Sequence, residues 1–206
     1  MNNPVRALVQ RHYESTLMQQ IGGRVSGERV LEIGCGRGVG TEIIFKRFGA
    51  QEVHAFDVDP EMIALARRRL SAFPCDQLSL FVGDAAAIEA EDGTFDAVFD
   101  FGIIHHIPDW KRAVSEVVRV LRPGGRFFFE EVTQQALARW FYRTFLDHPK
   151  LDRFSAREFV EELQEQGIIV GENTKEWFFG DFVVGVGYKA NKTLSLILRE
   201  KNDGTT

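Results

Sequence analysis

The sequence predicts an α/β fold with a doubly wound sheet of seven strands, mostly parallel, and an antiparallel strand in a C-terminal hairpin. Strand-like apolar runs alternate with helical patterns between residues 29 and 132. A glycine-rich loop, "GCGRG" at 34–38, joins the first strand to the first helix. The last two strand-like runs are separated by "FGD" at 179–181, which is too short for a crossover helix and therefore predicts a hairpin.

The first elements follow from apolar spacing. Residues 4–21 have the three- and four-residue spacing of a helix, which Gly22 and Gly23 should end. A strand is expected at 29–33, a helix near 39–48 and a strand at 52–56.

The next elements continue this alternation. We expect a helix from Pro60 to Ala72, with Asp59 as its cap, and strands at 78–82, 95–101 and 126–132. The helix at 109–121 has one apolar stripe, whereas Glu116 and its charged neighbours should occupy the other face. Such alternation predicts a parallel sheet covered on both faces by right-handed crossovers.

The C-terminal third has a different pattern. A helix is expected at 134–146, and "SAREFVEELQEQG" starts another with a capping box, Ser155 with Glu158, and ends it at Gly167. Strands at 168–178 and 182–190 form the predicted hairpin, and the chain should fray from about Asn202.

Composition excludes several classes of protein. The 206 residues suit one domain, and we expect a cytoplasmic protein because no apolar run is long enough to span a bilayer or to form a signal peptide. Two cysteines without metal-ligand spacing argue against a structural metal. The net charge of −5 argues against nucleic acid as a partner, and the basic run at 67–69 is read as a solvated helix face.

The glycine loop predicts a nucleotide-like ligand held close to the backbone. Gly34, Gly36 and Gly38 are spaced two and two, and Val39 stands where a dinucleotide motif would have its third glycine. Glu32 just before the loop would repel a pyrophosphate but would favour a ligand with an ammonium and a sulfonium group. Pairing of Glu32 with a basic side chain is the alternative.

Two further carboxylates follow the next strands. Asp57, at the end of the second strand, can accept hydrogen bonds from both hydroxyls of a ribose. Asp84, after the third strand, can accept from an adenine amino group, while Val58 and Ala85 pack on the faces of the ring.

Five segments in order resemble the class I methyltransferases that use S-adenosylmethionine. These are "VLEIGCGRG", "FDVDPEMI", "VGDA", "FDAVFDFGIIHHI" and "VLRPGG", which lie within residues 28–132. The double-histidine segment resembles the small-molecule, methyltransferase type 11-like branch. The resemblance implies a Rossmann-like fold and S-adenosylmethionine as cofactor, with S-adenosylhomocysteine as product.

The resemblance also implies roles for single residues. Glu32 would lie near the amino end of the methionine part, and the backbone of Gly34, Cys35 and Gly36 under it. Asp57 would hold the ribose, and Asp84, Val58 and Ala85 the adenine. Asp100 and Phe101 would reach the methionine part, and Tyr13 is a weaker candidate on an N-terminal helix that folds over the cofactor.

The acceptor should meet the methyl group beyond the ends of the fourth and fifth strands. His105 and His106 are the candidate bases, and Glu130, with Glu131 beside it, can orient an acceptor. We expect His106 to be structural and His105 to lie nearer the substrate. A dedicated catalyst is optional, because positioning alone lowers such barriers by about 7–11 kcal/mol.

These inferences divide a single domain, 1–206, into four parts. They are a helical cap at 1–28, a cofactor-binding core at 29–132, a substrate lid at 133–154, and a C-terminal helix and hairpin at 155–190. Trp140, Phe141, Tyr142 and Phe145 would give the lid an aromatic face that suits a flat or apolar acceptor, although aromatic stripes at helical spacing are more often plain core.

The sequence favours methyl transfer to an O, N or C nucleophile of a small organic acceptor, by a monomer or homodimer without a membrane partner. One alternative is a non-catalytic subunit that binds S-adenosylmethionine. Another is a protein or RNA methyltransferase, which the acidic balance and the lack of an Asn-Pro-Pro-Tyr motif disfavour. Aminopropyl transfer is disfavoured because histidines replace the acidic cluster that a polyamine would need.

Overall fold

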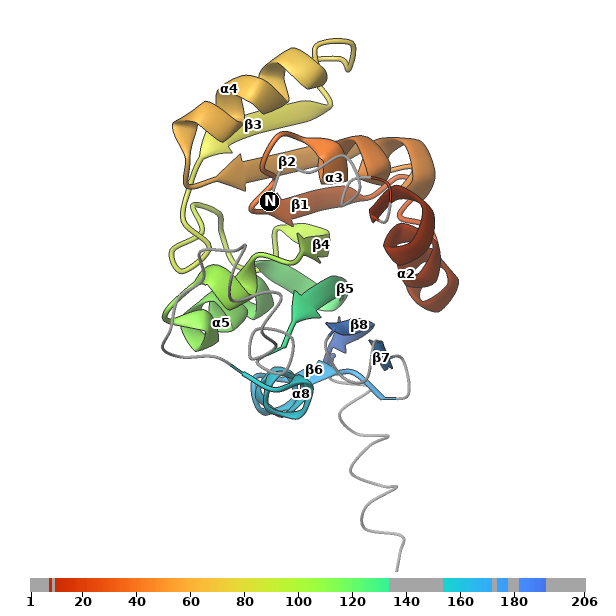
Figure 1. The fold of residues 1–206 in the computed structure, drawn as a ribbon, viewed down its shortest axis with the longest axis vertical. Helices are drawn as coiled ribbons and strands as arrows, with labels where there is room; N and C mark the ends of the chain where they lie inside the picture. The colour runs from red at the N-terminus through yellow and green to blue at the C-terminus, as the bar shows by residue number, and fades with distance from the viewer. Residues whose placement is uncertain (1–7, 9, 134–153, 172–173, 178–181, 192–206) are drawn as a thin grey trace, which may run out of the picture.

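The computed structural model describes residues 8, 10–133, 154–171, 174–177 and 182–191 (Figure 1). Its sheet has the strand order β3-β2-β1-β4-β5-β8-β6, with β7 also paired to β8. The first five strands pair in parallel, and β8 pairs antiparallel with β5, β6 and β7. Their bounds are β1 Arg29–Ile33, β2 Glu52–Asp57, β3 Leu78–Val82, β4 Phe95–Phe101, β5 Leu121–Val132, β6 Ile168–Ile169, β7 Thr174–Trp177 and β8 Phe182–Lys189.

The predicted fold class is confirmed, and the strand number differs for a local reason. The run expected as one strand at 168–178 contains two, β6 and β7. Gly171 lies between them with φ +56°, a left-handed conformation that cannot continue a strand. The predicted hairpin is present. β8 lies inside the sheet: β5 pairs with it on one side, and β6 and β7 both pair with it on the other.

The helices lie on the two faces of the sheet (Figure 1). Their bounds are η1 Gln10–Glu14, α2 Ser15–Gly22, α3 Val39–Ile43, η2 Ile44–Phe48, α4 Pro60–Arg69, η3 Ile104–His106, α5 Trp110–Val120 and α8 Ala156–Glu165. The helix expected near 39–48 is thus α3 followed by the π-helical turn η2. The described part of the 4–21 helix is likewise π-helical before α2.

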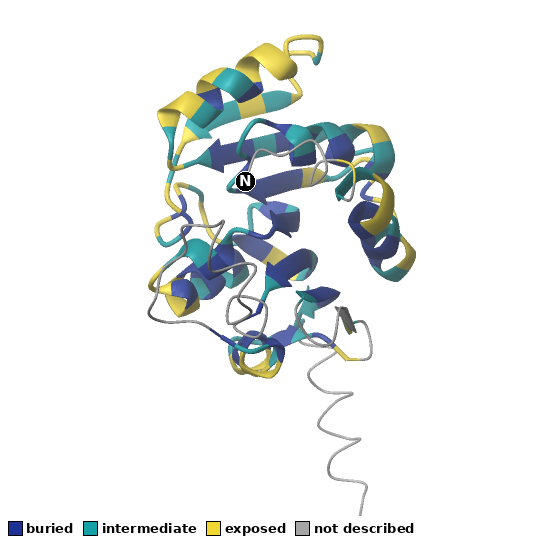
Figure 2. Cartoon of the chain, in the orientation of Figure 1, coloured by how far each residue is buried: buried dark blue, intermediate teal, exposed yellow. Residues whose placement is uncertain are grey.

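Two apolar cores form, one on each face. Neighbouring residues on a strand contribute to opposite cores, as with Val30 and Leu31 in β1, because side chains alternate across a sheet. Met18 of α2, Ile43 of α3 and Ala66 of α4 join the core on the Val30 face. The core on the other face contains apolar side chains from α5 and α8. Figure 2 shows buried residues along the middle of the sheet and exposed ones on the outer sides of the helices.

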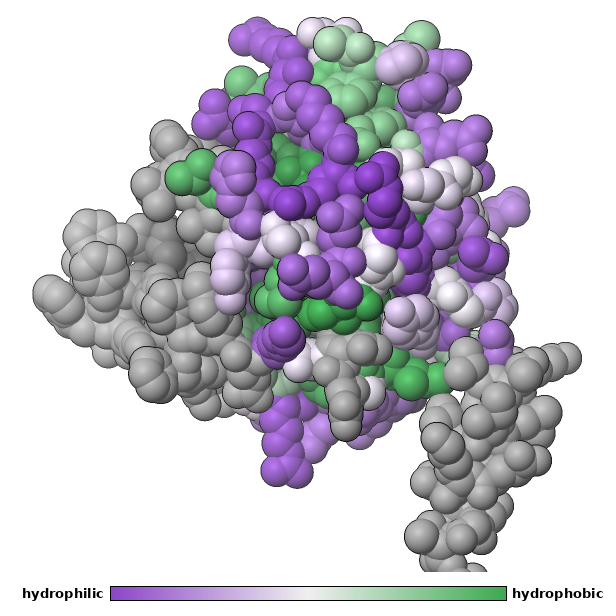
Figure 3. Space-filling model, turned by 90° about the vertical axis from the view of Figure 1, so that its right-hand side faces the viewer, coloured by the Kyte–Doolittle hydropathy of each residue, from purple (hydrophilic) through white to green (hydrophobic). Residues whose placement is uncertain are grey.

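The predicted caps are confirmed. The Asp59 carboxylate accepts from the backbone N–H of Glu61, 2.8 Å away, at the start of α4. Ser155 and Glu158 form the reciprocal capping box of α8. Figure 3 shows one side of the molecule, where hydrophilic residues cover most of the described surface and hydrophobic ones show in patches between them.

Three sequence-based expectations need correction. Helix α4 ends at Arg69, not Ala72, and β5 begins at Leu121, not at 126. The residues between Leu121 and Arg126 enter β5 as an irregular stretch, because the register with β4 shifts there and Gly124 has φ +79°. Glu116 of α5 is buried, and its carboxylate accepts from the backbone N–H of Ile88 at 2.9 Å and from Arg119.

Residues 83–94, all described, cross from β3 to β4 without a helix, so this crossing does not supply the helical cover expected on its face of the sheet; α4 packs on the other face. The helix expected at 134–146 and the aromatic face of the lid lie outside the described residues. Within the described ranges, no helix has the length and apolar character needed to cross a membrane.

Candidate functional site

Apart from Tyr13 in η1, the predicted site residues lie at or just after the carboxyl ends of β1 to β5. The sheet reverses its order between β1 and β4, and ligands of open α/β sheets bind in the crevice at such a point. The strand register brings neighbouring ends together: Ile33 pairs with Phe56 on one side and with Asp100 on the other. Phe101 pairs with Glu130 in the same way.

The glycine loop has the backbone that its sequence predicts. Gly34, Gly36 and Gly38 have φ values of 63°, 52° and 78°, which only glycine adopts without strain. A Cβ atom at Gly34 would overlap the side chain of Ile103. The lack of a side chain at Gly34 therefore allows the loop that follows β4 to approach the glycine loop. Among the described residues, no atom lies within 4 Å of a Cβ built at Gly36, so these residues leave the loop's backbone open to a ligand on that side.

Asp57 holds this loop in place. Its Oδ2 accepts from the N–H of Gly36 at 2.8 Å, and its Oδ1 accepts from the N–H of Asp59 at 3.0 Å. Each carboxylate oxygen has a second lone pair, so both can still accept a hydroxyl. The bond from Asp57 to the glycine loop escapes sequence reasoning, since 21 residues separate the partners.

Glu32 is buried, with 1% of its surface exposed, and accepts a hydrogen bond from the hydroxyl of Thr41. Burial raises the pKa of Glu32 to about 8; the bond from Thr41 opposes this rise, and the charges of Asp57 and Asp100 add to it. The carboxyl group is therefore largely protonated at neutral pH, and a nearby positive charge would restore its ionised form. The alternative role expected for Glu32, pairing with a basic side chain, is wrong: its hydrogen-bond partner is Thr41.

The residues predicted to surround the adenine differ in exposure. Val58 is 73% exposed, and Asp84 is exposed, with its Oδ1 accepting from the N–H of Ala86 at 2.8 Å. Ala85 is only 5% exposed and packs in the apolar core. The Asp84 carboxylate and the Val58 side chain are thus accessible to a ligand, whereas the Ala85 side chain is part of the apolar core.

Asp100 and Glu131 form a buried carboxyl pair, both 0% exposed. Burial first, and then repulsion from Glu131, raise the pKa of Asp100 well above its usual range. Burial also raises the pKa of Glu131, although hydrogen bonds from the N–H groups of Ile104 and His105 oppose the rise. A proton on either carboxyl group removes the repulsion between them.

The two predicted histidines lie in η3 with their ring centroids 4.1 Å apart. His105 is 6% exposed, and its Nδ1 lies 2.5 Å from Oε2 of Glu131. His106 is half-buried. His105 is thus tied into the interior, and the expectation that His106 is structural and His105 nearer the substrate stays a prediction.

The other predicted residues have mixed surroundings. Cys35 is buried, and burial raises the pKa of its thiol, so it stays protonated. Phe101 and Glu130 are buried, and Tyr13 in η1 is 42% exposed. The ring of Phe101 lies against Gly40.

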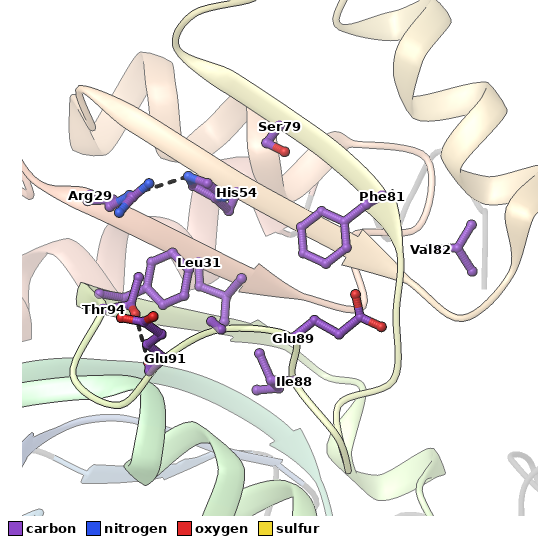
Figure 4. A pocket seen from close by; sticks show the side chains of 12 residues that line it. Arg29, Leu31, His54, Ser79, Phe81, Val82, Ile88, Glu89, Glu91 and Thr94 are labelled. Atoms are coloured by element: carbon purple, nitrogen blue, oxygen red, sulfur yellow. Dashed lines mark hydrogen bonds between the residues drawn. The ribbon is translucent and has the colours of Figure 1, made fainter.

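A cavity of about 500 Å³ lies elsewhere, over the part of the sheet that the β3 to β4 crossing leaves without a helix (Figure 4). Its lining includes Leu31, His54 and Phe81 from three neighbouring strands, with Glu89 and Glu91 of the crossing. No predicted site residue lines it, so it is distinct from the glycine-loop site.

Comparison with known proteins assigns the core segment. Residues 30–125 match the family model described as "Methyltransferase domain". The fatty-acid O-methyltransferase of Mycolicibacterium smegmatis is 35% identical over 119 residues, 58% of this chain and 41% of the relative. The demethylmenaquinone methyltransferase of Shouchella clausii is 26% identical over 167 residues, 80% of this chain and 70% of the relative. The matched part of this chain spans about half or less of the length of the first curated relatives.

Solved structures share the fold. An S-adenosylmethionine-dependent methyltransferase from Aquifex aeolicus has a TM-score of 0.69 and 22% identity, covering 91% of this chain and 93% of its own. Phosphoethanolamine N-methyltransferase 2 of Haemonchus contortus has a TM-score of 0.70 and 20% identity, covering 85% and 52%. It was solved with phosphomonomethylethanolamine and S-adenosylhomocysteine.

Proposed function

Because this chain has the fold and the domain of the class I S-adenosylmethionine-dependent methyltransferases, we propose that it transfers a methyl group from S-adenosylmethionine to a small organic acceptor. The observation that carries this proposal is the glycine loop tied to Asp57, with the buried acids Glu32 and Asp100 on the neighbouring strands. The cofactor, when bound, supplies an electrophilic methyl group and leaves as S-adenosylhomocysteine.

The charges of the site suit this cofactor. Glu32 and Asp100 are both kept from ionising by burial, and a ligand with an ammonium and a sulfonium group would make their ionised forms favourable. A pyrophosphate would gain nothing from them. In this proposal Glu32 serves the methionine amino group, and the backbone of Gly34, Cys35 and Gly36 lies along the methionine part.

The remaining cofactor contacts follow from the strand ends. Asp57 accepts from the ribose hydroxyls while it holds the glycine loop. Asp84 and the exposed Val58 serve the adenine ring, with Ala85 supporting from the core. Phe101 and the backbone near Asp100 border the methionine end. Tyr13, on η1, is the candidate for closing the site from the N-terminal side.

The acceptor is proposed to be a small molecule. The similar proteins are named for a fatty acid, demethylmenaquinone and phosphoethanolamine, so the acceptor atom differs among them. Alignment and exclusion of water do most of the work in such a displacement. His106 is half-buried, whereas His105 and Glu130 lie deeper, so His106 is the first candidate for taking a proton from an acceptor.

Isothermal titration of the full chain with S-adenosylmethionine tests the proposal. The wild-type protein should bind, and Asp57→Asn should weaken binding about tenfold or more, because hydrogen bonds to a charged acceptor contribute about 1.5–3 kcal/mol. Asp59→Asn is the matched control: it lies two residues away, and asparagine still caps α4. No binding by the wild type at millimolar cofactor would refute the proposal, and equal affinity for both variants would refute the ribose contact.

A non-catalytic subunit would also bind the cofactor, so turnover must be measured separately. The assay follows formation of S-adenosylhomocysteine with a panel of phenols, quinones, fatty acids and amines. Turnover with one of them supports the enzyme. Cofactor binding with no turnover on small acceptors, and turnover on proteins or RNA instead, would favour the alternatives. Sedimentation of the same samples tests the expected monomer or homodimer.

A further inference from the structure

Two buried carboxyl groups hold the turn that follows β4. Oδ1 of Asp100 accepts from the N–H groups of Gly102 at 3.0 Å and Ile103 at 2.9 Å. Oε1 of Glu131 accepts from the N–H of Ile104 at 2.6 Å, and Oε2 accepts from that of His105 at 3.2 Å. Four consecutive amides therefore each donate to a carboxylate oxygen, which fixes the path of the backbone that carries both histidines.

Glu131 makes one further contact, to the His105 side chain. Its Oε2 lies 2.5 Å from Nδ1 of His105. An ionised carboxylate only accepts hydrogen bonds, so Nδ1 must carry the proton and a neutral ring has its lone pair on Nε2. The ring of His106 lies against that of His105, at 4.1 Å between centroids and 39° between planes. The orientation of the first ring thus constrains the second.

The surroundings keep Glu131 as the acceptor of this network. Asp100 from β4 and Glu130 from β5 are the acids around it, and His105 and His106 from η3 are the bases. Both carboxylate oxygens of Glu131 accept backbone N–H groups of the turn, which favours the ionised form of Glu131. The ionised carboxylate accepts three N–H groups: the backbone N–H groups of Ile104 and His105, and the ring N–H of His105.

We propose that Glu131 is a positioning residue of this site, which fixes the Nδ1–H tautomer of His105 and the 102–105 turn and so sets where both imidazoles lie. The contacts are independent of the proposed function, and only their catalytic consequence rests on it. Where an acceptor must lose a proton, the imidazole that receives it needs a lone pair in a fixed direction. Glu131 supplies the tautomer and the direction of the His105 ring, and through the contact between the two rings it constrains His106, the first candidate for receiving that proton.

The tautomer can be read from nitrogen NMR shifts of the histidine side chains in the full-length protein, with His105→Gln used for assignment. His105 should be in the Nδ1–H form at neutral pH in the wild type. Glu131→Gln should move a large fraction of it to the Nε2–H form, because an amide offers one acceptor atom where the turn and ring need two. Glu116→Gln is the matched control, since Glu116 is also buried and also accepts from a loop N–H, that of Ile88.

An Nε2–H tautomer of His105 in the wild type would overturn the proposal without any variant. An unchanged tautomer and unchanged pH titration of His105 in folded Glu131→Gln would also overturn it. With an acceptor that the wild type turns over, kcat of Glu131→Gln should fall about tenfold or more while its cofactor affinity is kept. Absence of cofactor binding in the wild type, with the tautomer as expected, would refute the proposed function and leave the role of Glu131 intact.

Discussion

In the proposed function, Glu32 couples cofactor binding to protonation. Its pKa of about 8 in the folded chain exceeds the ordinary value of 4.5, so the folded state binds a proton that the unfolded state releases between these values. Its contribution to stability is fully present below about pH 4.5 and is lost as the pH rises through about 8. A cationic ligand lowers this pKa again, so binding at neutral pH should release protons.

The first prediction concerns this release. Near pH 7, titration of S-adenosylmethionine in two buffers of different ionisation enthalpy should give different apparent binding enthalpies for the wild type. Glu32→Gln should shrink the difference, since the proton of Glu32 no longer leaves. Glu116→Gln should behave as the wild type, because the pKa of Glu116 is lowered by Arg119. The same buffer dependence in Glu32→Gln as in the wild type would contradict the prediction.

Two residue-scale features could be predicted and one could not. The acids at the ends of β1 and β2 and the glycines between them follow from the local order of the sequence. Which of His105 and His106 faces inward does not, because neighbours in a single helical turn have similar local patterns. The answer depends on Glu131, 26 residues later, and on the pairing of β4 with β5.

At the scale of elements, α3 lies tightly on β1 and β4 through Gly40. A Cβ atom there would overlap the carboxylate of Glu32 and the ring of Phe101. Helix α3 can therefore bring the hydroxyl of Thr41 to Glu32 only because residue 40 has no side chain. The first turn of α3 is thus fitted to the site as well as to the core.

Gly40→Ala should lower the free energy of unfolding by about 1–3 kcal/mol, the usual cost of overpacking, and should also weaken cofactor binding. Gly27→Ala is the comparison: φ at Gly27 is +79° but no atom lies within 4 Å of a Cβ there, so only about 1 kcal/mol of backbone strain is expected. Urea unfolding measures both. If Gly40→Ala binds the cofactor as tightly as the wild type does, the close packing of α3 against Glu32 does not affect cofactor binding.

The strands and helices with clear periodicity could be read from the sequence, and their interruptions could not. The strand at 168–178 has continuous β-type residues, and the break at Gly171 depends on its φ value. The start of β5 at Leu121 depends on pairing with Phe95 of β4. The sequence "RPGG" that follows Leu121 is typical of a turn, so the sequence alone does not predict a strand there. The charged neighbours of Glu116 predict a solvent-facing position for it, but Glu116 is buried because its carboxylate accepts from Arg119 and from the backbone N–H of Ile88.

For the whole molecule, the position of β8 argues that residues beyond the matched family segment complete the same sheet. β8 pairs with β5 over seven residues, from Arg126 with Tyr188 to Val132 with Phe182. Val183 of β8 joins one core, and Val184 and Val186 join the other. The prediction of a single domain is consistent with these contacts and needs a direct test.

A chain ended after Phe154 tests it. Without α8 and β6 to β8, the outer edge of β5 has unpaired N–H and C=O groups, and apolar side chains of both cores are exposed. The shortened protein should lose cooperative thermal unfolding and should aggregate, whereas the full chain should unfold in one transition. A shortened chain that stays monomeric and unfolds cooperatively would show that the first five strands are a domain by themselves.

The interior place of β8 also has a consequence for synthesis. A ribosome makes β1 to β5 first, and the neighbour of β5 is completed only when Lys189 has emerged. Until then the outer edge of β5 is unpaired and its phenylalanines are exposed on the nascent chain. Unpaired strand edges and exposed apolar surface promote aggregation. The sheet can therefore close only after β8 has been made, and molecular chaperones should matter most during that interval.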